Sequence, residues 1–241
     1  MEHLRPLLDR YDRILIFDTE TTGLSFERDE IIQFSAVVVS CPQGNVELEE
    51  YDRLLLLAPG KRVPPEITRL TGITTEEIAR RGIPREQVCR EIGELISGNT
   101  LLAAYNAHFD LSFLFHLFAT YGDPECLRGK DKLDLLTVYR DRRDYPHRLC
   151  NAIEAYHLQD KVRNSHRADQ DALATAYVMA AMGAERNDLL NYVNLFGYIP
   201  KFGPPRRPIH SVTYRPQPYD RRAPLYQCAA PGAYVGEKNY G

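Results

Sequence analysis

The sequence lacks any two cysteines at the close spacing that zinc sites and redox motifs use. Its cysteines are odd in number and scattered along the 241 residues: Cys41, Cys89, Cys126, Cys150 and Cys228. This pattern argues against a disulfide framework and against a zinc cluster. We therefore expect most of these side chains to be small buried hydrophobic groups in a reducing cytoplasm.

The sequence also lacks an apolar stretch long enough to span a bilayer. Residues 1–13 are charged throughout and contain no apolar core of signal-peptide length. These two absences predict a soluble, cytoplasmic protein with no membrane partner. The apolar fraction of 44% is that of an ordinary globular chain, and the length suffices for one large domain or two small ones.

Charge is divided unevenly between the body of the chain and its C-terminal end. The net charge is −3, but residues 200–241 contain seven Lys or Arg and two Asp or Glu, so they carry +5 and the preceding residues −8. Half of the sixteen prolines lie between Pro200 and Pro231. We interpret residues 186–241 as a linker and a basic Pro/Tyr/Arg-rich tail, extended or partly disordered, after a folded domain of residues 1–185. Such a tail favours a polyanionic partner.

Short apolar runs separated by turns predict the strands of the folded domain. The runs are rich in β-branched residues and lie at 14–17, 31–40, 46–57, 101–105 and 133–136. Because short connections join the first three, we expect an antiparallel meander.

Segments with helical periodicity, or apolar on nearly all sides, alternate with the later strands. They predict helices at 84–96, 107–120, 137–140, 149–156 and 168–183. Asn106 is expected to cap the second of these helices. Strands followed by alternating helices and strands favour an α/β domain in which helices cover a mixed sheet.

The most informative segment is Asp-Thr-Glu-Thr-Thr-Gly-Leu at 18–24, directly after the apolar run at 14–17. Alternate side chains of a strand face the same side, so Asp18 and Glu20 are expected side by side, about 6.5–7 Å apart along the backbone. Two carboxylates at the end of a buried strand repel each other unless a cation lies between them. A solvated strand end followed by a turn is the simpler alternative.

Three further polar residues stand at the ends of apolar elements. Asp110 lies in the first turn of the helix predicted at 107–120, in a helix so apolar that an acid needs a partner. Asp171 lies on the apolar side of the last predicted helix, whereas Asp169 is expected to point to solvent. His166, on the preceding loop, has the chemistry of a proton acceptor near neutral pH. Taken alone, Asp110 could also be an ordinary helix-start acid and His166 an ordinary loop histidine.

The four carboxylates Asp18, Glu20, Asp110 and Asp171 together form an oxygen-rich, thiolate-free ligand set. Such a set favours hard cations such as Mg²⁺ or Mn²⁺, and four negative charges match two divalent ions. Two such ions about 3.5–4 Å apart stabilise the attacking and leaving oxygens of a phosphoryl displacement. The sequence therefore predicts a two-metal site suited to phosphoryl displacement.

The order of these motifs resembles that of the DEDDh 3′–5′ exonucleases of the RNase H-like superfamily, and is similar in particular to the proofreading epsilon subunits of bacterial DNA polymerase III. The motifs are Phe17–Leu24, Asn106–Asp110 and His166–Ala172, and the similarity covers residues 13–182. Pro64–Thr74 resembles the family's segment beside the terminal nucleotide. Each motif alone is weak, but their order and spacing together are specific. The resemblance implies an α/β fold, an RNase H-like mixed sheet flanked by helices.

The resemblance also implies an activity and a role for each residue. The enzyme would hydrolyse the terminal phosphodiester of single-stranded or frayed DNA 3′ ends and release nucleoside 5′-monophosphates. All four acids would bind the two Mg²⁺ or Mn²⁺ ions, Asp110 largely through water, and His166 would take the proton of the attacking water. The implied substrate contacts are Thr19, Thr21, Thr22, Gly23, Leu24, Glu66, Thr71, Asn106 and Phe109.

Two positions depart from the family pattern. Tyr105 and Thr71 stand where many relatives have His, which predicts altered substrate contacts and not loss of activity. Three alternatives stay open: a polymerase-associated proofreading subunit with the tail as a docking arm, an RNA-trimming exoribonuclease, and a catalytically silent nucleic-acid-binding module. Nothing in the sequence reads a 2′-hydroxyl, so DNA and RNA are not distinguished. The intact acids and His166 argue against the silent module.

Overall fold

The protein is represented by a computed structural model that describes residues 1–217, 223–228 and the backbone of 234–235. Its main sheet has the strand order β3-β2-β1-β4-β5. The strands are β1 (Arg13–Thr21), β2 (Ile31–Ser40), β3 (Glu47–Leu54), β4 (Thr100–Ala104) and β5 (Lys132–Asp134). β1, β2 and β3 pair antiparallel, whereas β1, β4 and β5 run parallel. The predicted meander and mixed sheet are confirmed.

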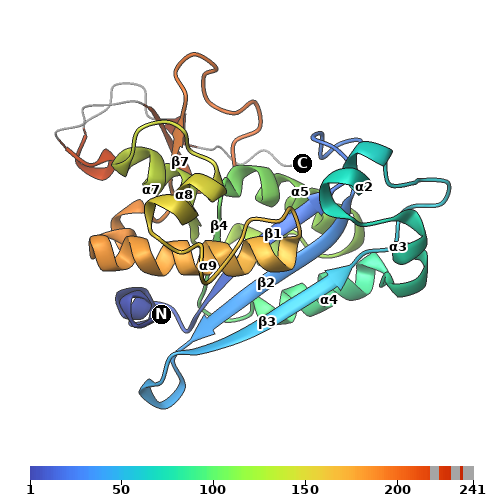
Figure 1. Cartoon of the computed structure of the whole chain (residues 1–241), viewed down its shortest axis with the longest axis horizontal. Coiled ribbons are helices and arrows are strands. Elements are labelled where there is room, and N and C mark those ends of the chain that lie inside the picture. Colours follow the sequence, from blue (N-terminus) through green and yellow to red (C-terminus); the bar gives the residue numbers. More distant parts are fainter. Residues whose placement is uncertain (218–222, 229–233, 236–241) are drawn as a thin grey trace.

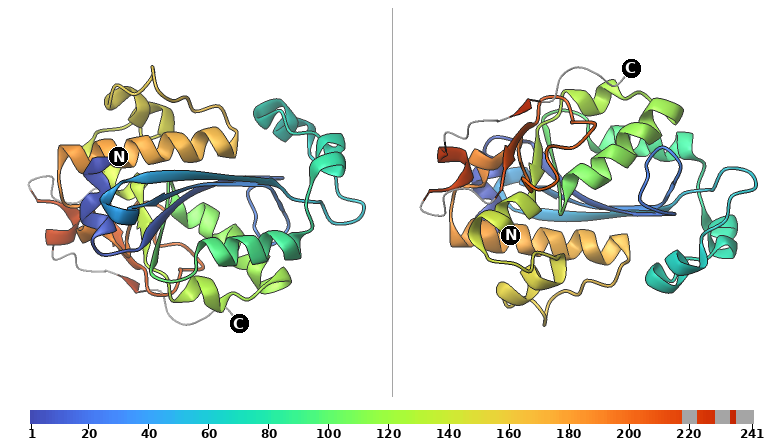
Figure 2. Two further views of the ribbon diagram at one scale, coloured as in Figure 1. Left: turned by 90° about the horizontal axis from the view of Figure 1, so that it is seen from below. Right: turned by 90° about the horizontal axis from the view of Figure 1, so that it is seen from above.

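Helices cover both faces of this sheet (Figures 1 and 2). α9 (Ala168–Glu185) lies across one face, on the same side as α7 (Leu135–Arg142) and α8 (Leu149–Ala155). α4 (Arg85–Leu95) and α5 (Ala107–Tyr121) cover the other face. The shorter helices are η1 (Glu2–Leu4), α1 (Arg5–Leu8), η2 (Pro42–Gly44), α2 (Pro65–Thr71), α3 (Thr75–Arg81) and α6 (Glu125–Arg128).

The alternation of side chains along β1 divides the core between the two faces. Its even-numbered apolar residues pack in the cluster that contains α9, and its odd-numbered ones pack with α4 and α5. The pairing of β1 with β2 stays in register through Glu20. Asp18 and Glu20 therefore point toward the α9 side and Thr19 toward the α5 side. This parity decides which helix each polar residue meets.

The start of α5 differs from the sequence expectation. Asn106 adopts a left-handed backbone conformation with φ of 69°, and its side chain forms no capping hydrogen bond. Instead, the buried carboxylate of Asp134 accepts a hydrogen bond from the backbone N–H of Ala107 at 3.0 Å. The same carboxylate caps α7 by accepting from the N–H of Thr137 at 3.1 Å. One acid at the end of β5 thus holds the N-termini of two helices.

Residues 186–217 are folded, which corrects the predicted extended linker. After η3 (Leu189–Tyr192), β6 (Leu195–Tyr198) pairs in parallel with β7 (Thr213–Pro216), and β8 (Tyr234–Val235) pairs antiparallel with β7. We call residues 186–217 the annex. Its buried apolar side chains enter both clusters of the core: Leu189, Tyr192, Leu195, Phe196, Ile209, Val212 and Tyr214. Residues 218–222, 229–233 and 236–241 of the predicted tail lie outside the described residues.

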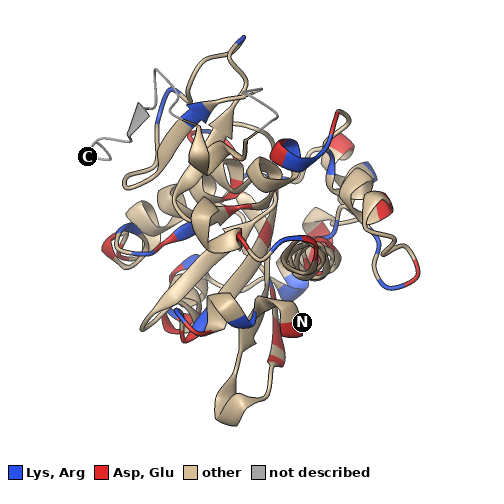
Figure 3. Ribbon diagram, turned by 90° about the vertical axis from the view of Figure 1, so that its left-hand side faces the viewer, with Lys and Arg blue, Asp and Glu red and all other residues tan. Residues whose placement is uncertain are grey.

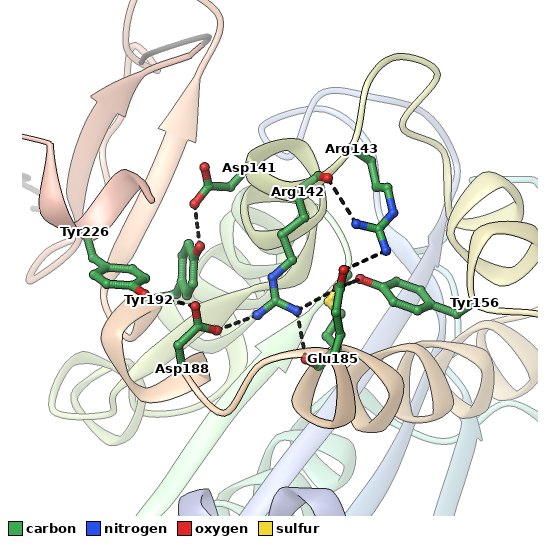
Figure 4. A network of polar contacts seen from close by, with 9 residues as sticks. Asp141, Arg142, Arg143, Tyr156, Glu185, Asp188, Tyr192 and Tyr226 are labelled. Carbon is green, nitrogen blue, oxygen red and sulfur yellow. Dashed lines mark hydrogen bonds and ion pairs between the residues drawn. The ribbon is translucent and has the colours of Figure 1, made fainter. Parts of the chain in front are cut away.

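A polar network fixes the annex to α7 and α9 (Figure 4). The guanidinium of Arg142 is buried, and it pairs with Glu185 at 3.2 Å and with Asp188 at 2.5 Å. Tyrosine hydroxyls of η3 and of η4 (Leu225–Gln227) donate to neighbouring acids, Tyr192 to Asp141 and Tyr226 to Asp188. These bonds connect the end of α7 to the chain that follows α9.

Positions of Lys or Arg and of Asp or Glu are interspersed along the ribbon (Figure 3). The edge strand β3 is acidic, with Glu47, Glu49, Glu50 and Asp52 along its length. Charge on an edge strand disfavours pairing with another sheet. No helix in the described part of the chain is long and apolar enough to cross a membrane.

Candidate active site

Three carboxylates meet where the end of β1 approaches the start of α9. Asp18 and Glu20 come from β1, and Asp171 comes from the first turn of α9. One oxygen of each lies within 4.8 Å of the others. None of the three forms an ion pair with a residue in the described part of the chain. Three carboxylate oxygens at this spacing are suited to a divalent cation.

Burial and mutual repulsion raise the pKa values of this acidic triad. The pKa of Asp18 lies well above its ordinary value, first because of burial and then because of the charges of Asp110, Asp171 and Glu20. Burial, followed by the charges of Asp171 and Asp110, raises the pKa of Glu20 to about 8. Burial also raises the pKa of Asp171. Without a cation the site therefore retains protons that a bound metal would displace.

Asp110 approaches from the opposite face of the sheet. Its carboxylate is buried at the start of α5 and accepts two hydrogen bonds from Thr19, one from the backbone N–H at 3.0 Å and one from the hydroxyl at 2.7 Å. Burial raises the pKa of Asp110 to about 7, although the bonds from Thr19 act in the opposite direction. Both bonds engage the same oxygen, Oδ1, and Asp110 is not part of the closely spaced triad. It borders the triad through Asp18, whose pKa its charge raises.

His166 lies on the loop before α9 and lines the same cavity as the acids. Its backbone is left-handed, with φ of 54°. The carboxylate of Asp171 accepts hydrogen bonds from the Asn164 side chain at 2.5 Å and from the Ser165 N–H at 3.0 Å. One acid of the triad thus also fixes the loop that carries the histidine. Asn164 was not predicted from the sequence, which marks it only as a polar residue shortly before the start of a helix.

Gln33 of β2 is a second supporting residue that the sequence analysis missed. It is fully buried opposite Glu20 in the register, and its side-chain oxygen accepts from the N–H of Ala168 at 3.2 Å. It therefore caps α9 and positions the first turn of that helix against β1. A glutamine inside an otherwise apolar strand was the available signal. Asp169, expected to point to solvent, keeps 37% of its side chain exposed and stands outside the triad.

The acids open into a cavity of about 980 Å³. Three of the predicted substrate residues, Thr19, Asn106 and Phe109, line it together with His166. The remaining walls come from the end of α7, from residues 143–149 after it, and from Arg186, Ile199 and Gln217 of the annex. The sequence analysis did not predict this second half of the cavity.

The other predicted substrate residues do not line the cavity: Thr21, Thr22, Gly23, Leu24, Glu66 and Thr71. Leu24 is 87% exposed, as a side chain awaiting a contact would be. Thr71 is buried, and its hydroxyl donates to the carbonyl of Ile67 at 2.9 Å. A Cβ on Gly23 would lie 2.5 Å from the Asp29 carboxylate, so packing of the turn already requires glycine. Substrate contact by these six residues stays a prediction.

A protein-family model matches most of the chain that forms the acidic site. The model RNase_T, described as "Exonuclease", matches residues 15–179. The matched range contains the four acids and His166, whereas the annex lies beyond its end.

Two relatives align with more than two thirds of the chain. The DNA polymerase III PolC-type protein of Halalkalibacterium halodurans is 33% identical over 198 residues, which cover 79% of this chain and 13% of that protein. The 3′-5′ exonuclease DinG of Staphylococcus aureus is 30% identical over 169 residues, or 68% of this chain and 17% of that protein. The chain thus spans less than a fifth of the length of either relative.

Solved structures share the fold. E. coli Exonuclease I in complex with a dT13 oligonucleotide superposes with a TM-score of 0.65 at 23% identity, over 75% of this chain and 43% of that one. Exonuclease I of Methylocaldum szegediense gives a TM-score of 0.64 at 25% identity, over 75% of this chain and 42% of that one. These likenesses confirm the α/β architecture of a mixed sheet flanked by helices.

Proposed function

We propose that this chain, which belongs to the RNase_T exonuclease family, removes nucleotides from the 3′ ends of DNA as nucleoside 5′-monophosphates. The observation that carries the proposal is the convergence of Asp18, Glu20 and Asp171 within 4.8 Å, with Asp110 and His166 on the same cavity. The names of the relatives support DNA as the polymer, since they include a DNA polymerase and an exonuclease solved with a DNA oligonucleotide.

The metal site is part of this proposal. Asp18, Glu20 and Asp171 would hold one Mg²⁺ or Mn²⁺, and Asp18 with Asp110 would contribute ligands for a second. The residues fit such ions, because the donors are carboxylates only, and burial, followed by mutual repulsion of Asp18 and Glu20 with the neighbouring acids, raises their pKa values. When bound, two such ions stabilise the charge on the attacking and leaving oxygens of a phosphoryl displacement.

His166 would accept the proton of the attacking water. His166 lines the cavity, and the loop that carries it is held by the Asp171 carboxylate through Asn164 and Ser165. An imidazole can accept a proton near neutral pH, which a water molecule poised for attack must lose. Thr19 would keep the Asp110 carboxylate in place through its two hydrogen bonds.

Digestion of 5′-labelled single-stranded DNA, duplex DNA and RNA oligomers tests this function. With Mg²⁺ or Mn²⁺ the label should stay on products that shorten stepwise from the 3′ end, and EDTA should stop the reaction. Immediate release of a labelled mononucleotide, or internal cuts, would contradict the proposed polarity. Faster loss of RNA than of DNA would favour the exoribonuclease alternative.

The likeness to DNA polymerase III PolC-type proteins also supports a second candidate role, as the proofreading partner of a polymerase. The chemistry would be the same, and the C-terminal segment would serve as the docking arm. Co-purification of the chain with a polymerase subunit, abolished by deletion of residues 218–241, would support this role.

A further inference from the structure

We propose that the arginine-rich end of the cavity binds the internucleotide phosphates of the strand that enters the active site. This strand subsite comprises Arg140, Arg148 and Arg186, with Tyr145 at its rim. The inference rests on the proposed 3′-exonuclease function. It adds which residues hold the DNA on the 5′ side of the cleaved bond.

The arginines that line the cavity fall into two groups. Arg142 and Arg143 are neutralised by acids of α9 and of the turn that follows it (Figure 4). Arg140, Arg148 and Arg186 form no ion pair with any residue in the described part of the chain. Because these three guanidinium groups keep their charge and their donors, they are available to a phosphate.

Two acids, Asp141 and Asp144, line this end of the cavity. The Asp141 carboxylate accepts hydrogen bonds from the Tyr192 hydroxyl and from the Leu225 N–H, the latter at 2.9 Å. Asp144 is the other acid among the lining residues at this end. The cavity is therefore acidic where β1 meets α9 and basic where α7 ends. A phosphate chain with metal ions at one end complements this division of charge.

The rim of the subsite is the loop after α7, which hydrogen bonds hold in place. The hydroxyl of Tyr105 donates to the carbonyl of His147 at 2.9 Å, and a ring nitrogen of His147 lies 3.0 Å from the carbonyl of Arg143. The ring of Tyr145 packs edge-on against His147, with centroids 5.9 Å apart, and remains 85% exposed. An exposed aromatic ring on a fixed loop beside unpaired arginines suits a single strand, whose bases stack on such rings.

The position of the subsite defines which part of the strand it holds. Thr21 to Leu24, predicted to contact the substrate, do not line the cavity, whereas the acids do. With the cleaved phosphate at the acids, the nucleotides on its 5′ side are those that enter the cavity. Arg186 lies beyond the range matched by the exonuclease family model, so part of this wall belongs to the annex.

The test compares Arg148→Ala, Arg186→Ala and the double variant with Arg90→Ala. Arg90 is an exposed arginine of α4 outside the cavity, so it controls for the removal of charge alone. On single-stranded DNA of about 15 nucleotides, the double variant should raise KM about tenfold and change kcat less than about twofold. The slope of log KM against log salt should fall by about 0.7 for each phosphate that the variant no longer neutralises. The control should match the wild type.

A small substrate separates this inference from the function on which it rests. Thymidine 5′-p-nitrophenyl phosphate contains only the terminal nucleotide and a leaving group, so the double variant should hydrolyse it at the wild-type rate. An unchanged KM and salt slope on the oligonucleotide, or equal impairment of the double variant on both substrates, would contradict the subsite. Neither result would contradict the proposed nuclease function of the wild type. If the wild type hydrolyses neither substrate, the proposed function fails.

Binding provides a readout that does not depend on turnover. Fluorescence anisotropy with a labelled oligonucleotide, in the Asp18→Asn background with Mg²⁺, should show weaker binding when both arginines are replaced. Equal affinity of Asp18→Asn with and without the two arginine substitutions would contradict the subsite, whether or not the wild type is active.

Discussion

The two ends of the cavity carry opposite charge and are built in opposite ways. The acidic end places buried or half-buried carboxylates on β1, α5 and α9, where hydrogen bonds hold Asp110 and Asp171. The basic end places mostly exposed arginines on a helix end, a loop and the annex. Like charges crowded inside the fold destabilise it until a cation arrives, whereas solvated arginines cost little. The difference separates the groups that would perform chemistry from those that would hold the strand.

The largest effect should come from the centre of the acidic end. Asp18→Asn removes the carboxylate that borders all three other acids, so hydrolysis of DNA 3′ ends should fall by at least about 10³-fold. The fold should persist, because the substitution removes repulsion from a metal-free site. Activity assays paired with circular dichroism measure both. An unfolded Asp18→Asn protein, or one with near-normal turnover, would break the assignment.

The next effect should come from the loop beside the acids. His166→Ala should lower kcat by about 10²-fold or more, the usual scale for removal of a general base, with a smaller change in KM. His116→Ala, at an exposed position on α5 outside the cavity, is the matched control. A His166→Ala enzyme that keeps its full rate would remove this residue from the mechanism.

The acidic end should also make the stability of the metal-free protein depend on pH. The folded pKa values of Glu20, about 8, and Asp110, about 7, exceed the unfolded values of about 4.3 and 3.9. The folded state therefore binds more protons between about pH 4 and pH 8, and the free energy of unfolding should decrease as pH rises through this window. In EDTA the Tm should fall from pH 5 to pH 8, by about 2–4 °C for each kcal/mol by which the free energy of unfolding decreases.

Metal should reverse this trend. Mn²⁺ or Mg²⁺ should raise the Tm more at pH 8 than at pH 5, because at the lower pH protons compete for the same oxygens. A metal-free Tm that stays constant or increases from pH 5 to pH 8 would show that burial and repulsion do not raise the pKa values of these carboxylates.

The smallest effect should come from the rim of the basic end. Tyr105→Phe removes one hydroxyl that donates to the His147 carbonyl at 2.9 Å, at a cost to the free energy of unfolding of about 0.5–1.5 kcal/mol. The loosened rim should raise KM for single-stranded DNA a few-fold and leave kcat nearly unchanged. Urea titration and steady-state kinetics measure the two effects. A lower kcat with unchanged KM would place Tyr105 at the acidic end instead.

Much of the acidic end can be predicted from the sequence, because it depends on side-chain alternation within one strand and on the order of three short motifs. Strand alternation alone puts Asp18 and Glu20 on one side, and the order of the three motifs adds Asp110, His166 and Asp171. The structure brings these five residues to a single cavity. The residues that position these five are harder to predict from the sequence. Gln33 and Asp134 act through hydrogen bonds between elements that are distant in the sequence, and no local pattern encodes such a bond.

The basic end and the annex were missed for another reason. The described strands of the annex have four residues or fewer, and prolines and arginines interrupt its apolar positions, so no window shows a period. Its buried residues are identified only by what they contact, as Tyr214 contacts Phe196 and His108. Composition therefore suggested a free tail where the chain packs against the sheet.

The odd-and-even arrangement along β1 limits how this protein can change over evolution. Inserting one residue ahead of Asp18 would turn both strand acids toward α5 and bring Thr19 to α9, although every motif residue would still be present. An insertion of two residues would preserve the facing directions and only lengthen the strand. Descendants of this sequence should therefore tolerate length changes before the first motif in pairs, or outside the strand altogether.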